Sequence, residues 1–234
     1  MIAPSTLPAH WLAWNARTGA PFHGPFTFYS GNCPTRVWEY AWAWHTADPR
    51  AGQTAIDVGG GLSGFGILLA RHGLGVTVVD PDVAAHATSA LLPAWSRAWT
   101  AHLDHSRDLS ELPDDSVDVA FSLSVIEHIA QPRDRKQLMA EVHRVLRPGG
   151  RFVVTLDLDL HLHPFSAERH RAGHRNVSVA ELLAAAPFEL VEGDLTELYG
   201  LPAFAPSEIH RRAAAGAFAM AHGHLLTQAF VLRC

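Results

Sequence analysis

The sequence of 234 residues has few of the features that mark secreted, membrane-spanning or nucleic-acid-binding proteins. Its two cysteines, Cys33 and Cys234, cannot form a disulfide framework, which is typical of a reducing cytoplasm. No run of about 18 apolar residues could span a bilayer, and the first residues lack the basic and apolar blocks of a secretory signal. The net charge of -5 gives no general attraction to a phosphate backbone. We therefore expect a cytoplasmic protein with no membrane partner and no nucleic-acid partner.

Aromatic residues are concentrated in the first 50 positions, between prolines and glycines. Within this region "TRVWEYAWAWH" has apolar residues at the spacing of a short helix. We interpret residues 1–52 as an N-terminal helical layer. It is either an appendage that packs on the rest of the protein or a lid over a binding site, and the sequence leaves both possibilities open.

Alternating strand and helix signals begin at residue 54, which predicts βαβ units and a parallel sheet in a second domain, residues 53–234. Helices are expected in "GFGILLARHG", in residues 82–97, in "RDRKQLMAEVHRVLRPGG" and after the capping box formed by Ser178 and Glu181. Seven strands are expected, in "TAIDVG", "GVTVVD", part of residues 98–105, "SVDVAFSLS", "RFVVTLDL", "FELVEG" and "LLTQAFVLR". The predicted fold class is α/β, with a doubly wound, mostly parallel seven-stranded sheet and helices on both faces.

A glycine-rich loop follows the first predicted strand, in "AIDVGGGLSGFG". Gly59, Gly61 and Gly64 have the spacing of a dinucleotide-binding turn, although glycines also serve ordinary tight turns. The second strand ends at Asp80, whose carboxylate can accept both hydroxyls of an adenosine ribose. Asp57 lies two residues before the first glycine and would repel a pyrophosphate, whereas it would attract a cation. S-adenosylmethionine carries a sulfonium, an ammonium and an adenosine but no phosphate, and is the favoured cofactor.

The motifs together resemble those of the class I methyltransferases that use S-adenosylmethionine, particularly the enzymes that act on small molecules. The resemblance covers residues 53–157 well and the remainder in outline. "AIDVGGGLSG" is similar to the first motif of the family, although Ser63 stands where many members have a third glycine. "VTVVDPD", "HSRDLSELPDDSVDVAFSLSVIEHI" and "VLRPGG" match the later motifs in order. The fold that this implies is the Rossmann-like methyltransferase fold.

The resemblance also implies a role for each matching residue. Asp57, Gly59 and Gly61 would form the cofactor loop. Asp80 would bind the ribose, with Pro81 beside the adenine. Asp108 would meet the adenine amino group and Leu109 would cover the ring, unless Asp108 is simply a helix cap. Ser122 and Ser124 would lie near the methionine portion.

Candidate catalytic residues follow the fourth and fifth strands. A base helps to deprotonate a hydroxyl, amine or acidic carbon before methyl transfer, and we consider His128, Asp157 and His161 for this role. "TLDLDLHLHPF" alternates leucines with polar residues, so that Asp157, Asp159, His161 and His163 share a face if the segment is extended. Two histidines and a carboxylate could instead bind a metal, but a polar surface ribbon is the commoner explanation and we predict no metal.

The sequence therefore predicts an enzyme that transfers a methyl group from S-adenosylmethionine to a small-molecule acceptor. Two alternatives remain open. The same cofactor could be cyclised or cleaved to release methylthioadenosine, or the protein could bind the cofactor and a partner chain without catalysis. Neither the acceptor nor the oligomeric state can be read from the sequence.

Overall fold

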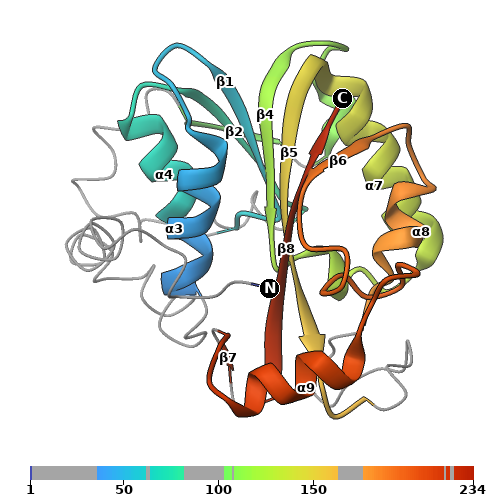
Figure 1. Cartoon of the computed structure of the whole chain (residues 1–234). Coiled ribbons are helices and arrows are strands. Elements are labelled where there is room, and N and C mark those ends of the chain that lie inside the picture. The colour runs from blue at the N-terminus through green and yellow to red at the C-terminus, as the bar shows by residue number, and fades with distance from the viewer. Residues whose placement is uncertain are drawn as a thin grey trace.

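A mixed β-sheet forms the centre of the protein (Figure 1). The computed structural model describes residues 1, 36–61, 64–81, 103–106, 108–162, 176–218, 220–221 and 224–234. Seven strands are hydrogen-bonded in the order β3-β2-β1-β4-β5-β8-β6, and the short β7 also pairs with β8. The strands are β1 (Thr54–Val58), β2 (Gly75–Val79), β3 (Leu103–Ser106), β4 (Val117–Leu123), β5 (Leu146–Asp159), β6 (Glu189–Glu192), β7 (Met220–Ala221) and β8 (Leu225–Arg233).

The strand order reverses between β1 and β4. Strands β3, β2, β1, β4 and β5 are parallel, whereas β8 runs antiparallel to both β5 and β6. Asp57 in β1 is in register with Phe121 in β4. In open α/β sheets the ligand binds beyond the carboxyl ends of the strands at such a reversal. The functional site is therefore expected beyond the ends of β1 and β4.

Helices cover both faces of the sheet (Figure 1). On one face, α3 (Arg36–Ala47) and α4 (Gly64–Arg71) bury apolar residues against β1, β4 and β5, including Ala43, Trp44, Phe65 and Leu68. On the other, α7 (Pro132–Val145) and α8 (Val179–Leu183) pack residues that include Met139, Val142 and Leu182 against the sheet. The two apolar layers explain why the central strands are buried on both sides.

Local signals set the ends of two of these helices. α4 is followed by Gly73 at φ +95°, in the left-handed region that glycine tolerates. α8 begins after Ser178, whose hydroxyl accepts a hydrogen bond from the Glu181 N–H at 3.4 Å, as the capping box predicts.

A third apolar cluster lies beyond the carboxyl end of β5. The helix α9 (Pro206–Ala214) runs across this end of the molecule, beside β7 (Figure 1). Its buried Ile209 joins Leu158, Leu160 and Leu226 from β5, the turn after it and β8. This cluster closes the sheet at the end where a ligand is expected.

The predicted fold class is confirmed, with differences in detail. The two-residue β7 and helix α9 were not expected. β5 begins at Leu146, so the "RPGG" segment, which was expected to end a helix before the strand "RFVVTLDL", lies inside the strand. The predicted helix at 82–97 and most of the predicted N-terminal layer lie outside the described residues. The predicted boundary between an N-terminal layer, residues 1–52, and a second domain, residues 53–234, stays a prediction. Among the described helices, none is long and apolar enough to cross a membrane.

Candidate functional site

The glycine-rich loop begins directly after β1 and turns back over the end of β2. Gly59 and Gly61 have φ values of +70° and +48°, which side chains rarely tolerate. The Gly59 N–H donates a hydrogen bond to the Val79 carbonyl at 2.7 Å, so the loop is fixed to the end of β2. A Cβ on Gly59 would lie 2.3 Å from Val125, which follows β4. The loop therefore packs closely at the strand-order reversal.

Two carboxylates lie against this loop. Asp57 is 3% exposed, and its Oδ2 would be 2.5 Å from a Cβ placed on Gly60. Asp80 follows β2, and its Oδ2 would be 3.3 Å from a Cβ on Gly61. The register of β1 and β2 puts both aspartates on the same face of the sheet. The two predicted acids are thus brought together around the glycines.

The residues predicted to contact the adenine lie after β2 and β3. Pro81 is exposed and directly follows Asp80. Asp108 caps η4 (Leu109–Glu111): its carboxylate accepts hydrogen bonds from the Ser110 hydroxyl and, at 2.8 Å, from the Ser110 N–H. These bonds hold the pKa of Asp108 below its ordinary value. Leu109 is buried in the main apolar core. The helix-cap role is therefore the one that the contacts show for Asp108, and the contact with adenine stays a prediction.

The two predicted serines have different environments. Ser122 lies in β4 one position after Phe121, and so faces the side of the sheet opposite to Asp57. Its hydroxyl is fully buried and, within the described part of the chain, has no hydrogen-bond partner. Ser124 follows β4 with φ +51°, and its N–H donates to the Thr155 hydroxyl at 3.0 Å. Of the two serines, Ser124 is therefore the one that is hydrogen-bonded to a residue on the same face of the sheet as Asp57.

Ser124 belongs to an acid–hydroxyl cluster, which we define as Glu39, Ser124, Thr155 and Asp157. Glu39 comes from α3, and its Oε1 accepts hydrogen bonds from the Ser124 hydroxyl at 2.6 Å and the Thr155 hydroxyl at 2.7 Å. Asp157 Oδ1 lies 3.4 Å from the same Ser124 hydroxyl. All four side chains are at most 4% exposed. Two buried carboxylates that share a hydroxyl favour a cation or a proton-bearing group beside them.

The cluster lies on the same face of the sheet as Asp57. Asp57 is in register with Phe121, and Phe121 with Val153, so Thr155 is the next same-face residue toward the carboxyl end of β5. In the antiparallel pair of β5 and β8, Asp157 is opposite Thr227, whose buried hydroxyl has no hydrogen-bond partner among the described residues. The polar face thus extends from the loop to β8.

The three predicted catalytic residues are in different places. Asp157 is in the acid–hydroxyl cluster, and its backbone N–H donates to buried Glu127 at 3.0 Å. His128 ends η5 (Ile126–His128) and is exposed. His161 lies in the turn after β5, is exposed, and stacks on His224. Of the three, Asp157 is the one that is buried.

Sequence reasoning missed Glu39, Thr155 and His224. Glu39 had a usable signal, because it is the one acid in the otherwise aromatic and apolar run of α3. Thr155 and His224 had none, since a threonine in a strand and a histidine between strands are both ordinary. His163, considered with Asp159 and His161 for a metal, lies outside the described residues.

Comparison with protein families matches residues 56–154 to a methyltransferase domain. An uncharacterized methyltransferase of Mycobacterium ulcerans is 37% identical over 125 residues, which are 53% of this chain and 46% of that protein. An uncharacterized methyltransferase of Mycobacterium bovis is 34% identical over 134 residues, 57% of this chain and 50% of that protein. The chain thus spans about half the length of the curated relatives that it matches. The predicted resemblance to class I methyltransferases is confirmed.

Solved structures share the fold. An S-adenosylmethionine-dependent methyltransferase from Mesorhizobium loti has a TM-score of 0.55 and 19% identity, over 84% of this chain and 97% of that one. The 1,6-didemethyltoxoflavin-N1-methyltransferase of Burkholderia thailandensis has a TM-score of 0.55 and 20% identity, over 100% and 92%. The cyclase SpnF has a TM-score of 0.60 and 19% identity, over 83% and 79%. These likenesses confirm the Rossmann-like methyltransferase fold.

Proposed function

We propose that this chain, whose residues 56–154 match a methyltransferase domain, is an enzyme that uses S-adenosylmethionine to methylate a small molecule. The observation that carries the proposal is the pair of carboxylates beside the loop, Asp57 against Gly60 and Asp80 against Gly61. A pyrophosphate at this loop would face two negative charges, whereas a cationic, phosphate-free nucleoside would be attracted.

The residues around the loop fit this cofactor. Gly59 and Gly61 have positive φ values, at which a side chain would be strained. Because glycine has no side chain, the backbone at both positions can approach a ligand closely. Asp80, at the end of β2, would accept the ribose hydroxyls. Asp57 and the acid–hydroxyl cluster lie on one face, where they would face the positively charged end. We keep Pro81, Asp108, Leu109 and Ser124 in the proposed cofactor site, and place Ser122 behind it.

Methyl transfer asks little covalent chemistry of the protein. When bound, S-adenosylmethionine supplies a methyl group on a positively charged sulfur, which is already activated. The chain must hold the acceptor in line with that group and exclude water. The buried side chains at the ends of β4 and β5 suit this role, since all members of the acid–hydroxyl cluster are at most 4% exposed.

Among the three candidate bases we favour Asp157. It is the one that is buried and that lies beside a hydroxyl network, with Ser124 at 3.4 Å. Its carboxylate could take a proton from a hydroxyl, amine or acidic carbon of an acceptor in hydrogen-bond reach. His128 and His161 are exposed, and solvent there would compete with an acceptor. We expect Asp157→Asn to lower the rate of transfer and His128→Ala to leave it nearly unchanged.

Two other functions differ in their products. The [4+2]-cyclase SpnF shows the same fold in a protein named for a different reaction, so the fold alone does not fix the reaction. Cyclisation or cleavage of the cofactor would release methylthioadenosine without an acceptor, whereas methyl transfer releases S-adenosylhomocysteine only when an acceptor is present. A non-catalytic binding protein would give neither product. The 8% exposure of Trp44 weighs against the last function, because that ring packs inward instead of forming a docking surface.

Calorimetry with the purified chain tests the cofactor assignment. We expect one molecule of S-adenosylmethionine or S-adenosylhomocysteine per chain, and no comparable binding of NAD. Asp57→Asn should weaken binding roughly 10- to 100-fold, the range expected for one hydrogen bond to a charged group. Saturable NAD binding that is stronger than S-adenosylmethionine binding would refute the proposal. A screen of small hydroxyl and amine compounds with isotope-labelled methyl donor would then identify the acceptor class. The cytoplasmic location stays a prediction.

A further inference from the structure

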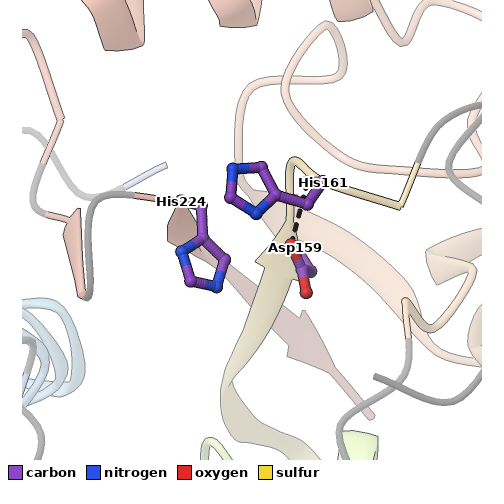
Figure 2. Close-up of side chains that lie close together, drawn as sticks. All are labelled: Asp159, His161 and His224. Atoms are coloured by element: carbon purple, nitrogen blue, oxygen red, sulfur yellow. Dashed lines mark hydrogen bonds between the residues drawn. The ribbon is translucent and has the colours of Figure 1, made fainter. Parts of the chain in front are cut away.

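We propose that Asp159, His161 and His224 bind a divalent transition-metal ion. One ligand atom from each residue, a carboxylate oxygen or a ring nitrogen, lies within 4.8 Å of the other two. Figure 2 shows the three side chains gathered at the end of β5. The sequence pattern groups Asp159 and His161 with His163, whereas the structure brings His224 beside them from a distant part of the chain.

The pairing of β5 with β8 brings the three residues together. Asp159, the last residue of β5, is in register with Leu225, the first residue of β8. The Leu160 N–H then donates to the His224 carbonyl at 3.0 Å, which extends the pairing by one step. The imidazole rings of His161 and His224 lie parallel, with centroids 4.2 Å apart and an angle of 8° between their planes. Both rings are therefore held at the same end of the sheet.

The carboxylate is positioned before any ion binds. Asp159 is 1% exposed, and its Oδ1 accepts a hydrogen bond from the backbone N–H of His161 at 2.9 Å. Its backbone N–H donates to Asn176 Oδ1 at 2.8 Å, and the Asn176 side-chain N–H donates to the Asp159 carbonyl at 3.1 Å. Such surrounding bonds orient the ligands of metal sites. His161 is exposed, so an ion can reach the site from solvent.

The donor set selects the class of metal. Two imidazoles with one carboxylate suit ions such as Zn²⁺, Co²⁺, Ni²⁺ or Fe²⁺, whereas Mg²⁺ and Ca²⁺ prefer oxygen ligands. With bonds of about 2.1 Å, two ligand atoms on one ion can be at most about 4.2 Å apart. The observed spread of up to 4.8 Å therefore requires a small closing movement. The exposed His161 ring can make it, and the buried Asp159 need not move.

The site lies next to the proposed acceptor region but does not depend on it. Asp157 and Asp159 share a face of β5, so the ion would lie one same-face step beyond the acid–hydroxyl cluster. Metal binding can be measured with no methyl donor or acceptor present. Failure of methyl transfer and failure of metal binding are therefore separate results.

Titration of the purified 234-residue chain with Co²⁺, after removal of metals with a chelator, tests the proposal. The sixteen histidines of the chain can bind ions weakly, so stoichiometry and variants must separate the site from the background. We expect one Co²⁺ per chain with visible ligand-field absorption, and displacement of Co²⁺ by Zn²⁺. His161→Ala and His224→Ala should each abolish the absorption. The control His45→Ala, which removes an exposed histidine in α3, should keep it.

A third variant separates charge from structure. Asp159→Asn retains an oxygen that can accept from the His161 N–H but removes the negative charge, and should weaken Co²⁺ binding roughly tenfold or more. His161 is exposed, so its removal should not unfold the protein, which circular dichroism would check. Unchanged Co²⁺ stoichiometry and absorption in both histidine variants would overturn the proposal, as would the absence of saturable binding by the unmodified chain.

Discussion

Substituting Gly60 by alanine is the sharpest test of the loop geometry. Gly60 is buried between two neighbours, and its new methyl carbon would lie 2.5 Å from Asp57 Oδ2, 2.7 Å from Asp57 Cγ and 3.1 Å from Val78 Cγ1. Ordinary contacts between such atoms are about 3.5–4.0 Å. Two contacts are therefore short by roughly 1 Å, and either the Asp57 carboxylate or the loop must move.

The magnitude follows from how little room Asp57 has. Its side chain is 3% exposed, so it cannot turn into solvent without disturbing the core. Overpacking of this kind costs typically about 1–3 kcal/mol. If the displacement also removes the Asp57 carboxylate from a bound cation, the affinity for S-adenosylhomocysteine or S-adenosylmethionine should fall roughly 10- to 100-fold, which corresponds to about 1.4–2.8 kcal/mol.

Calorimetry and urea unfolding would measure the two effects. Gly75→Ala is the matched control, because a Cβ at Gly75 meets nothing within 4 Å and the position is not strained. We expect Gly75→Ala to retain both affinity and stability, and Gly60→Ala to lose affinity. A Gly60→Ala protein that binds S-adenosylmethionine as tightly as the unmodified chain would refute the placement of Asp57 in the site.

Three further substitutions test other parts of the structure. Glu39→Ala removes the acceptor of the buried Thr155 hydroxyl and the nearer of the two acceptors of the Ser124 hydroxyl, and should lower the free energy of unfolding by about 2 kcal/mol; Glu39→Gln keeps an acceptor oxygen and should cost less than half as much in urea unfolding. Ser178→Ala removes the cap of α8 and should cost about 1 kcal/mol, seen as a lower urea midpoint with an unchanged slope. Burial raises the pKa of Asp118, but hydrogen bonds from the Thr54 N–H at 2.7 Å and from Arg147 outweigh it and hold the pKa below its ordinary 3.8. A lowered carboxyl pKa stabilises the fold above pH 3.8 and ceases to do so as the pH falls through the folded-state value. Asp118→Asn should therefore be about 1 kcal/mol less stable at pH 7, with a deficit that shrinks below pH 3.8; a constant deficit would contradict the assignment.

The parts of the fold that could be predicted depend on short-range signals. Apolar runs located five of the strands closely and β3 and β5 in part, and the Ser178–Glu181 capping box located the start of α8. The loop could be predicted because the glycines, Asp57 and Asp80 lie at strand ends, and parallel strands end at the same edge of the sheet. Because these residues meet at one edge of the sheet, Asp57 lies against Gly60 and Asp80 against Gly61.

The rest of the site depends on packing between distant segments. Glu39 reaches Ser124 and Thr155 because α3 packs on β4 and β5, and no local pattern specifies which helix face does so. His224 meets His161 through the antiparallel register of β8, which sequence reasoning did not assign. Ser122 shows that a motif match does not specify which way a side chain points. The match put Ser122 in the cofactor site, whereas strand alternation puts its side chain on the face of the sheet opposite to Asp57.

The position of β8 has a consequence for how the molecule is assembled. β5 and β6 are not neighbours; each pairs with β8, which follows both of them in the sequence. Until residues 225–233 leave the ribosome, the β5 backbone presents an open, apolar edge of the kind that recruits foreign strands. We expect nascent chains halted before residue 225 to be held by chaperones or to aggregate, and the sheet to close in a single late step.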